Sequence, residues 1–173
     1  HPIPRRQRQM CIRDRHKLPR GFCLDRSANN STGLRETLVV TNCIEVNNGD
    51  KLYFSRRPVD TIVNITFTQS RVPKKISKKK YLSEIAKKIE FKKFIAALSN
   101  KKLIYDEKKL QNKFFYVNFQ MVNALKRKEF VRIYFFLIDN KVVVMTIVSF
   151  KKPGKSRYSS FESFIKKLSK LSS

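Results

Sequence analysis

The sequence predicts a domain of the α+β class, in which one antiparallel β-sheet of about six or seven strands packs with two amphipathic helices. Three observations support this class. Residues 130–150 contain two apolar runs joined by Asp139-Asn140, which is the pattern of a β-hairpin. Several shorter stretches alternate apolar and polar residues, as half-buried strands do. Two further stretches, at about 78–98 and 159–171, repeat apolar residues at the spacing of a helix.

The chain has 173 residues, of which 41% are hydrophobic, enough for one domain with a core. We expect this domain to span 37–173, after an irregular, polar lead-in at 16–36. Within residues 1–15, Met10 to Arg15 resembles a translated sequencing adapter, so we expect this segment to be artefactual or disordered and the native N-terminus to be missing. Any targeting signal would be missing with it, and the compartment stays open.

The first predicted strands form a hairpin. Two runs, 37–46 and 51–57, flank Asn48-Gly49, and Asn-Gly favours a tight turn because both central residues of a type I′ turn need positive φ. The next run, 61–68, alternates apolar with polar residues. It is predicted to be a half-buried strand.

A basic connector at 71–80 leads into the first predicted helix, with Ser77 as its N-cap. Its apolar residues share one face, with a change of phase near Glu90 that suggests a bend: Leu82, Ile85, Ala86, Ile89, Phe91, Phe94, Ile95 and Leu98. A weak strand or turn follows at 102–110. A stronger strand is predicted at 112–122, with Phe115, Val117, Phe119 and Met121 on one face.

The hairpin at 130–150 is predicted to form the middle of the sheet and to pair with 112–122. Both faces of its first arm are apolar, which implies cover on both sides of the sheet. Charged residues interrupt the stretch, so it is not a membrane-spanning segment. The last helix is predicted to begin with a capping box, Ser159-x-x-Glu162. Its apolar stripe then comprises Phe161, Phe164, Ile165, Leu168 and Leu171.

Residues from about 64 to 171 resemble the PsbP fold family. The elements that carry the resemblance are a strand (NITFTQ), a polar loop, a helix (YLSEIAKKI), a long hairpin (FFLIDNKVVVMTIVSF) and a terminal amphipathic helix (YSSFESFIKKL). The chain departs from the family in having no Trp and a much higher positive charge. The resemblance implies a non-catalytic accessory or binding domain in an exported or organellar protein. It implies no particular functional residue.

The residue inventory argues against catalysis, and we expect no catalytic, cofactor-binding or metal site. The only histidines are His1 and His16, and the acidic residues are scattered along the chain. Without residue Cys11, which lies in the adapter-like segment, two cysteines are left. Cys23 and Cys43 either close one disulfide in an oxidising compartment or remain free thiols.

Positive charge is the remaining functional signal. The formal net charge is +26, and it falls to +22 when residues 1–15, with five basic residues and one acidic residue, are left out. Such a surface attracts polyanions. The candidate contacts form three groups along the chain: Lys74, Lys75, Lys78, Lys79 and Lys80, then Lys126, Arg127 and Lys128, and finally Lys151, Lys152, Lys155 and Arg157.

Three interpretations of the chain remain open. The first is a binding domain that contacts another protein or complex through its sheet and helix surfaces. The alternative is a basic RNA- or ribosome-associated protein that contacts the phosphate backbone, with aromatic residues such as Phe114-Phe115-Tyr116 as stacking platforms. In the third, the lysines only cover a solvated surface and reflect the amino-acid usage of an AT-rich genome.

Overall fold

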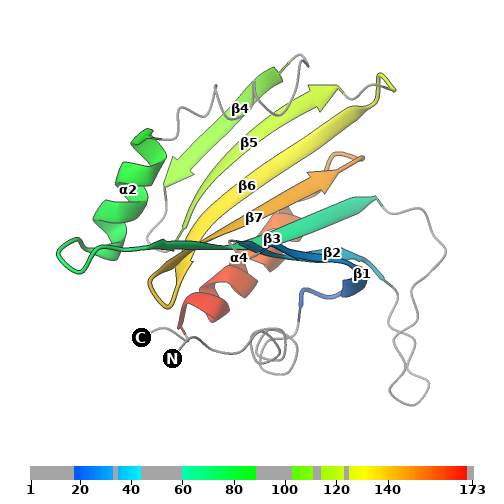
Figure 1. Ribbon diagram of the computed structural model, residues 1–173. Coiled ribbons are helices and arrows are strands. Elements are labelled where there is room, and N and C mark those ends of the chain that lie inside the picture. Colours follow the sequence, from blue (N-terminus) through cyan, green and yellow to red (C-terminus); the bar gives the residue numbers. More distant parts are fainter. Residues whose placement is uncertain are drawn as a thin grey trace.

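The protein is an α+β domain built on a single antiparallel sheet (Figure 1). The computed structural model describes residues 18–32, 35–43, 60–88, 103–110, 114–122 and 125–170. The seven described strands follow the order β1-β2-β3-β7-β6-β5-β4 across the sheet. The elements are β1 (Phe22–Thr32), β2 (Arg35–Asn42), β3 (Thr61–Arg71), α2 (Lys78–Lys88), β4 (Leu103–Leu110), β5 (Phe114–Val122), β6 (Lys128–Ile138), β7 (Lys141–Ser149) and α4 (Lys155–Lys170).

The two helices lie on opposite faces of the sheet (Figure 1). Val143 and Met145 of β7 belong to the same core cluster as Phe161 of α4. Val142, on the other face of β7, clusters with Leu82 of α2. Because side chains of a strand alternate between the two faces, an apolar run such as that of β7 can serve both layers. The result is three layers, with the sheet in the middle.

The predicted central hairpin is confirmed. β6 and β7 pair from Phe130↔Ser149 to Ile138↔Lys141. The turn between them is Asp139-Asn140, with φ values of 47° and 60°. Asp and Asn tolerate this left-handed region better than other residues with a side chain, which explains why the turn falls there. β6 also pairs with β5, as predicted.

The predicted irregular lead-in is wrong for residues 22–32, which form β1, and for the first residues of β2. β1 pairs with β2 from Phe22↔Asn42 to Thr32↔Arg35, with a register shift between Asp25 and Asn30. An edge strand needs only one row of backbone partners, so its sequence need not show the alternation of a half-buried strand. The turn at 47–50, the strand at 51–57 and the adapter-like segment 1–15 lie outside the described residues.

The start of α2 agrees with the sequence. The backbone N–H of Lys80 donates a hydrogen bond of 3.3 Å to Ser77 Oγ, so Ser77 is the N-cap, as predicted. The described part of α2 ends at Lys88, and the rest of the predicted helix lies outside the described residues.

The capping box predicted at the start of α4 is wrong, because the helix begins four residues earlier, at Lys155. Arg157 N–H donates to the carbonyl of Gly154, which sets the first turn directly after the loop. Ser159 therefore lies inside the helix, where its hydroxyl donates to the Lys155 carbonyl. Glu162, more than one turn further along, is left to contact the sheet instead of the helix terminus.

Candidate functional site

The predicted polyanion contacts lie at two opposite ends of the sheet. Arg71 pairs with Lys141 at the end where the β3–α2 loop begins. Val122 pairs with Lys128 at the other end, beside the β5–β6 loop. The 11 residues of β6 separate these ends, which corresponds to roughly 35 Å at about 3.3 Å per residue. The structure therefore divides the candidates into two surfaces.

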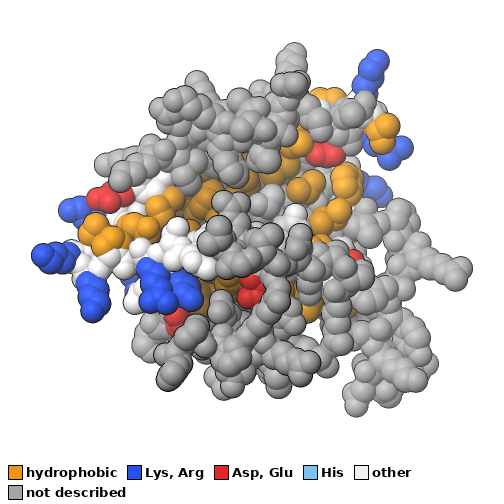
Figure 2. Space-filling model, in the orientation of Figure 1, with side chains coloured by type: hydrophobic (Ala, Val, Ile, Leu, Met, Phe, Trp, Pro, Cys, Tyr) orange, Lys and Arg blue, Asp and Glu red, His pale blue; other side chains and the backbone are white. Residues whose placement is uncertain are grey.

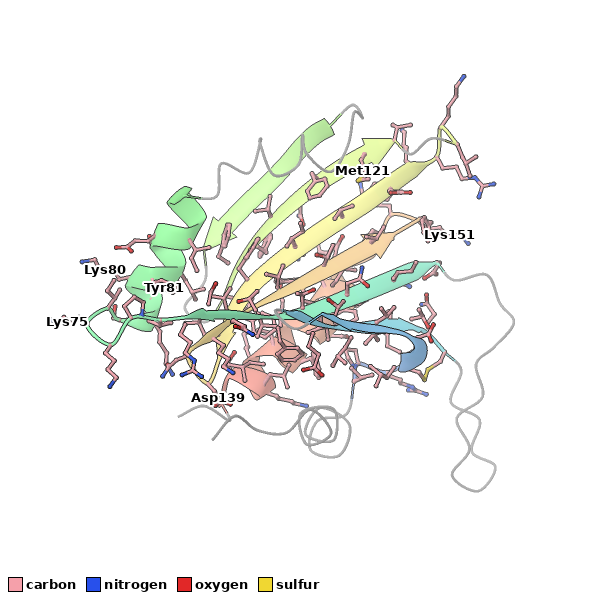
Figure 3. The ribbon with its side chains drawn as sticks, in the orientation of Figure 1. Lys75, Lys80, Tyr81, Met121, Asp139 and Lys151 are labelled. Carbon is pink, nitrogen blue, oxygen red and sulfur yellow. A yellow bond between two sulfur atoms is a disulfide. The ribbon has the colours of Figure 1, made fainter. Side chains whose placement is uncertain are left out.

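The first surface, which we call the basic end, joins the end of β3, the β3–α2 loop and the first turn of α2. All five lysines predicted on it, as well as Arg71, are exposed. Figure 2 shows Lys and Arg side chains gathered at this end, and Figure 3 places Lys75 and Lys80 there, with Asp139 nearby. Its basic residues are Arg71, Lys74, Lys75, Lys78, Lys79, Lys80 and Lys141.

Two features concentrate positive charge at the basic end beyond what the count of lysines implies. Lys78, Lys79 and Lys80 occupy the first turn of α2, which contains no acidic residue. The N-terminus of a helix carries a partial positive charge, so cations there are unfavourable. Arg71 and Lys141 are also direct cross-strand partners, an arrangement that places like charges opposite each other.

The second surface, which we call the loop end, joins the β5–β6 and β7–α4 loops. Six of the seven residues predicted on it are exposed: Lys126, Arg127, Lys128, Lys151, Lys152 and Lys155. Figure 3 shows Lys151 near Met121 of β5 at this end. Leu125 and Phe150 lie on the same two loops, with 73% and 39% of their surface exposed.

Arg157, the seventh candidate, is only partly exposed and already has partners within the chain. Its guanidinium donates to Asp60 Oδ1 at 3.3 Å and to Thr61 Oγ1 at 2.7 Å. It thereby ties the first turn of α4 to the start of β3. Its predicted contact with polyanions stays a prediction, beside this structural role.

A buried polar cluster, which the sequence analysis did not identify, connects α4 to the sheet. Its centre is Arg132 of β6, which is only 8% exposed. The Arg132 guanidinium carbon lies 4.2 Å from the ring centre of Tyr116 and 3.5 Å from that of Tyr158. Arg132 Nε donates to Asn118, its cross-strand partner. We call these residues and the two described next the Arg132 cluster.

The remaining donors of the Arg132 cluster converge on one carboxylate. Arg132 Nη1 donates to Glu162 Oε1 at 3.2 Å, and the Tyr134 hydroxyl donates to the same oxygen at 3.1 Å. Burial raises the pKa of Tyr134 far above its usual range, although the neighbouring Arg132 acts in the opposite direction. The arginine is stacked and hydrogen-bonded by the chain itself, so the cluster positions α4 and is not an open binding site.

The signal for this cluster was present in the sequence. Arg132 interrupts an apolar run, at a position whose neighbours two residues away are Phe130 and Tyr134. A cation on a buried strand face requires partners. Identifying them needed the β5–β6 register and the rotation of α4, which single-sequence patterns do not supply.

The other sequence expectations can now be placed. Phe114, Phe115 and Tyr116 are buried, with at most 5% of each exposed, so they are not platforms on which bases could stack.

Cys23 and Cys43 form a disulfide, with their Cα atoms 5.6 Å apart. No cluster of three or more potential metal ligands occurs in the described ranges. Among these same ranges no helix is long and apolar enough to cross a membrane.

Comparison with known proteins adds no relative. No protein-family model matches the sequence, and no curated protein matches it either. Function is therefore inferred from the geometry of the chain itself.

Proposed function

We propose that this chain is a non-catalytic, PsbP-like binding domain of an exported or organellar protein, and that it holds an acidic partner protein or complex at its basic end. The observation that carries the proposal is the charge of that end. The basic end has seven basic side chains, and the same described elements contain two acidic residues, Glu84 and Asp139. Electrostatic complementarity of this kind directs association with acidic partners.

The disulfide supports the proposed compartment. Cys23 lies in β1 and Cys43 follows β2, so the bond links the two outermost strands on this side of the sheet. Disulfides persist mainly in oxidising compartments such as the secretory pathway or the periplasm. The element order supports the PsbP-like part: β3, a basic loop and α2 precede the β6–β7 hairpin, and α4 follows it.

The RNA-associated alternative has less support. Recognition of single-stranded RNA commonly uses exposed aromatic rings as well as positive charge. The predicted aromatic platform at 114–116 is buried, which removes the stacking contacts expected there. RNA therefore serves as the competing ligand in the experiment.

The experiment measures binding of the 173-residue chain to fluorescent poly-L-glutamate and to single-stranded RNA over a salt series. The basic-end variant is Lys74→Gln/Lys75→Gln/Lys79→Gln. The matched loop-end variant, Lys126→Gln/Lys151→Gln/Lys152→Gln, removes the same charge at the other end. We expect the basic-end variant to bind polyglutamate about tenfold more weakly, with a salt dependence reduced by about one unit for each lost contact.

The loop-end variant should bind polyglutamate within about twofold of the unmodified chain, a difference set by long-range charge alone. Equal losses in the two variants would mean that bulk charge drives binding, and the proposal would be wrong. Tighter binding of RNA than of polyglutamate, lost in the basic-end variant, would establish the RNA-associated alternative instead.

A further inference from the structure

We propose that the loop end is a docking surface for membranes that contain anionic lipids, with Leu125 and Phe150 inserted into the headgroup region. This surface is separate from the basic end, and the proposal does not depend on the function proposed for the basic end. The two residues come from different loops at one end of the sheet.

The register fixes their common location. The β5–β6 loop, which contains Leu125, follows the pair Val122↔Lys128. Phe150 directly follows Ser149, whose partner is Phe130 of β6. Its backbone N–H donates to the Asp60 carbonyl at 2.9 Å, which holds this residue against the start of β3. Both apolar side chains therefore belong to the same end of the molecule.

Exposure distinguishes the loop end from the basic end. Among the residues whose side-chain burial the structure describes, Leu125 and Phe150 are the large hydrophobic ones that are exposed. A single exposed leucine is ordinary, but here both exposed residues lie among six exposed basic side chains. Figure 2 shows hydrophobic atoms beside Lys and Arg side chains at the tip of the β5–β6 hairpin. The basic end combines its charge with no such residue in the described ranges.

This combination matches the chemistry of a bilayer surface. Clusters of four to eight Lys or Arg are attracted to anionic headgroups, and apolar side chains add affinity when they enter the boundary between headgroups and acyl chains. A phosphate backbone or an acidic peptide would satisfy the lysines, but neither provides an apolar layer into which both Leu125 and Phe150 could insert. Among the described residues, the acidic ones near this end are Glu129, which is half-buried, and Asp60, which is paired with Arg157.

Sedimentation with vesicles tests the proposal on the 173-residue chain. The vesicles contain either phosphatidylcholine alone or phosphatidylcholine mixed with phosphatidylglycerol. We expect binding only to the mixed vesicles. The Leu125→Ser/Phe150→Ser variant should bind on the order of tenfold more weakly. The loop-end variant should lose about fivefold for each lysine, and therefore on the order of a hundredfold in total.

The basic-end variant is the matched control and should bind the mixed vesicles within about twofold of the unmodified chain. Full binding by Leu125→Ser/Phe150→Ser would overturn the proposal, as would equal losses in the basic-end and loop-end variants. Displacement from the vesicles by single-stranded RNA, without any effect of the two apolar substitutions, would identify a polyanion site and also overturn it. Because both substituted apolar residues are exposed, circular dichroism should show an unchanged fold.

Discussion

Glu162 of α4 lies 3.2 Å from Arg132 of β6, across the interface between the helix and the sheet. The side chain of Arg132 is 9% exposed and that of Glu162 is 20% exposed, so the pair is largely removed from water. A single ion pair at this depth contributes by preventing an unpaired buried charge rather than by its own attraction. The pair therefore sets the rotation of α4 on the sheet more than it adds to stability.

Removing one partner of this pair should cost much more than removing both. We expect Arg132→Met and Glu162→Met each to lower the free energy of unfolding by about 3 kcal/mol, because each leaves the other charge buried and unpaired. The double variant should cost clearly less than either single variant. Urea denaturation of the four proteins measures this coupling. Additive losses would show that the two residues act independently.

A conservative change at the same position tests the stacking of the arginine. Arg132→Lys keeps the positive charge but loses the planar group that lies between the rings of Tyr116 and Tyr158. We expect a loss of about 2 kcal/mol in the free energy of unfolding, since the contacts with the rings and with Asn118 are lost together. If Arg132→Lys unfolds at the same urea concentration as the unmodified chain, charge alone would account for the role of Arg132.

The raised pKa of Tyr134 predicts that the stability of the fold decreases at alkaline pH. Its pKa is raised in the folded protein, chiefly by burial, above its usual value near 10. In the unfolded chain it loses its proton near pH 10, whereas the folded protein still retains it. The contribution of Tyr134 is therefore complete below about pH 10, and above it stability falls by up to about 1.4 kcal/mol per pH unit.

Comparison with Tyr134→Phe isolates this effect from the titration of the lysines. Near pH 8 the variant should be about 1–2 kcal/mol less stable, because Arg132 and Glu162 lose the bridging hydroxyl. The difference should narrow as the pH rises from about 9 to about 11. Chemical denaturation at several pH values provides the measurement. Parallel stability curves for the two proteins would contradict the raised pKa.

These predictions also show how far the sequence alone determines the fold. The β6–β7 hairpin was predictable because two apolar runs flank Asp139-Asn140, a pair that suits a turn with positive φ. Ser77 was identified as an N-cap for a similarly local reason. β1 was missed because an edge strand is held by backbone pairing and by the Cys23–Cys43 bond, neither of which produces an alternating sequence.

The site was less predictable than the fold. The lysines could be found from composition, but their division between two ends depends on the strand order, which a single sequence does not give. The local spacing Ser159-x-x-Glu162 predicts a capping box. In the structure, the Glu162 carboxylate instead accepts a hydrogen bond from Arg132 of the sheet. The exposure of Leu125 and Phe150 could not be predicted, because sequence periodicity does not show which apolar residues in loops stay exposed.

The disulfide should stabilise the β1–β2 side of the sheet. Its cysteines are 20 residues apart, and a closed loop of this length lowers the entropy of the unfolded chain enough to contribute about 3 kcal/mol. We expect a reducing agent to lower the free energy of unfolding by this amount. The Cys23→Ser/Cys43→Ser variant should show the same loss and no further response to the reducing agent. Identical unfolding of the unmodified chain with and without reductant would show that the bond contributes nothing.

The N-cap of α2 provides a local test of the helix that carries Lys78, Lys79 and Lys80 of the basic end. Ser77→Ala removes the acceptor for the Lys80 N–H and should lower the free energy of unfolding by about 1 kcal/mol. Ser160→Ala is the matched control, because this exposed hydroxyl only donates to the Ser156 carbonyl within α4. Alanine is the better helix former, so the control should lose no more than a few tenths of a kcal/mol. Equal effects of the two substitutions, measured by urea denaturation, would contradict the assignment of Ser77 as the N-cap.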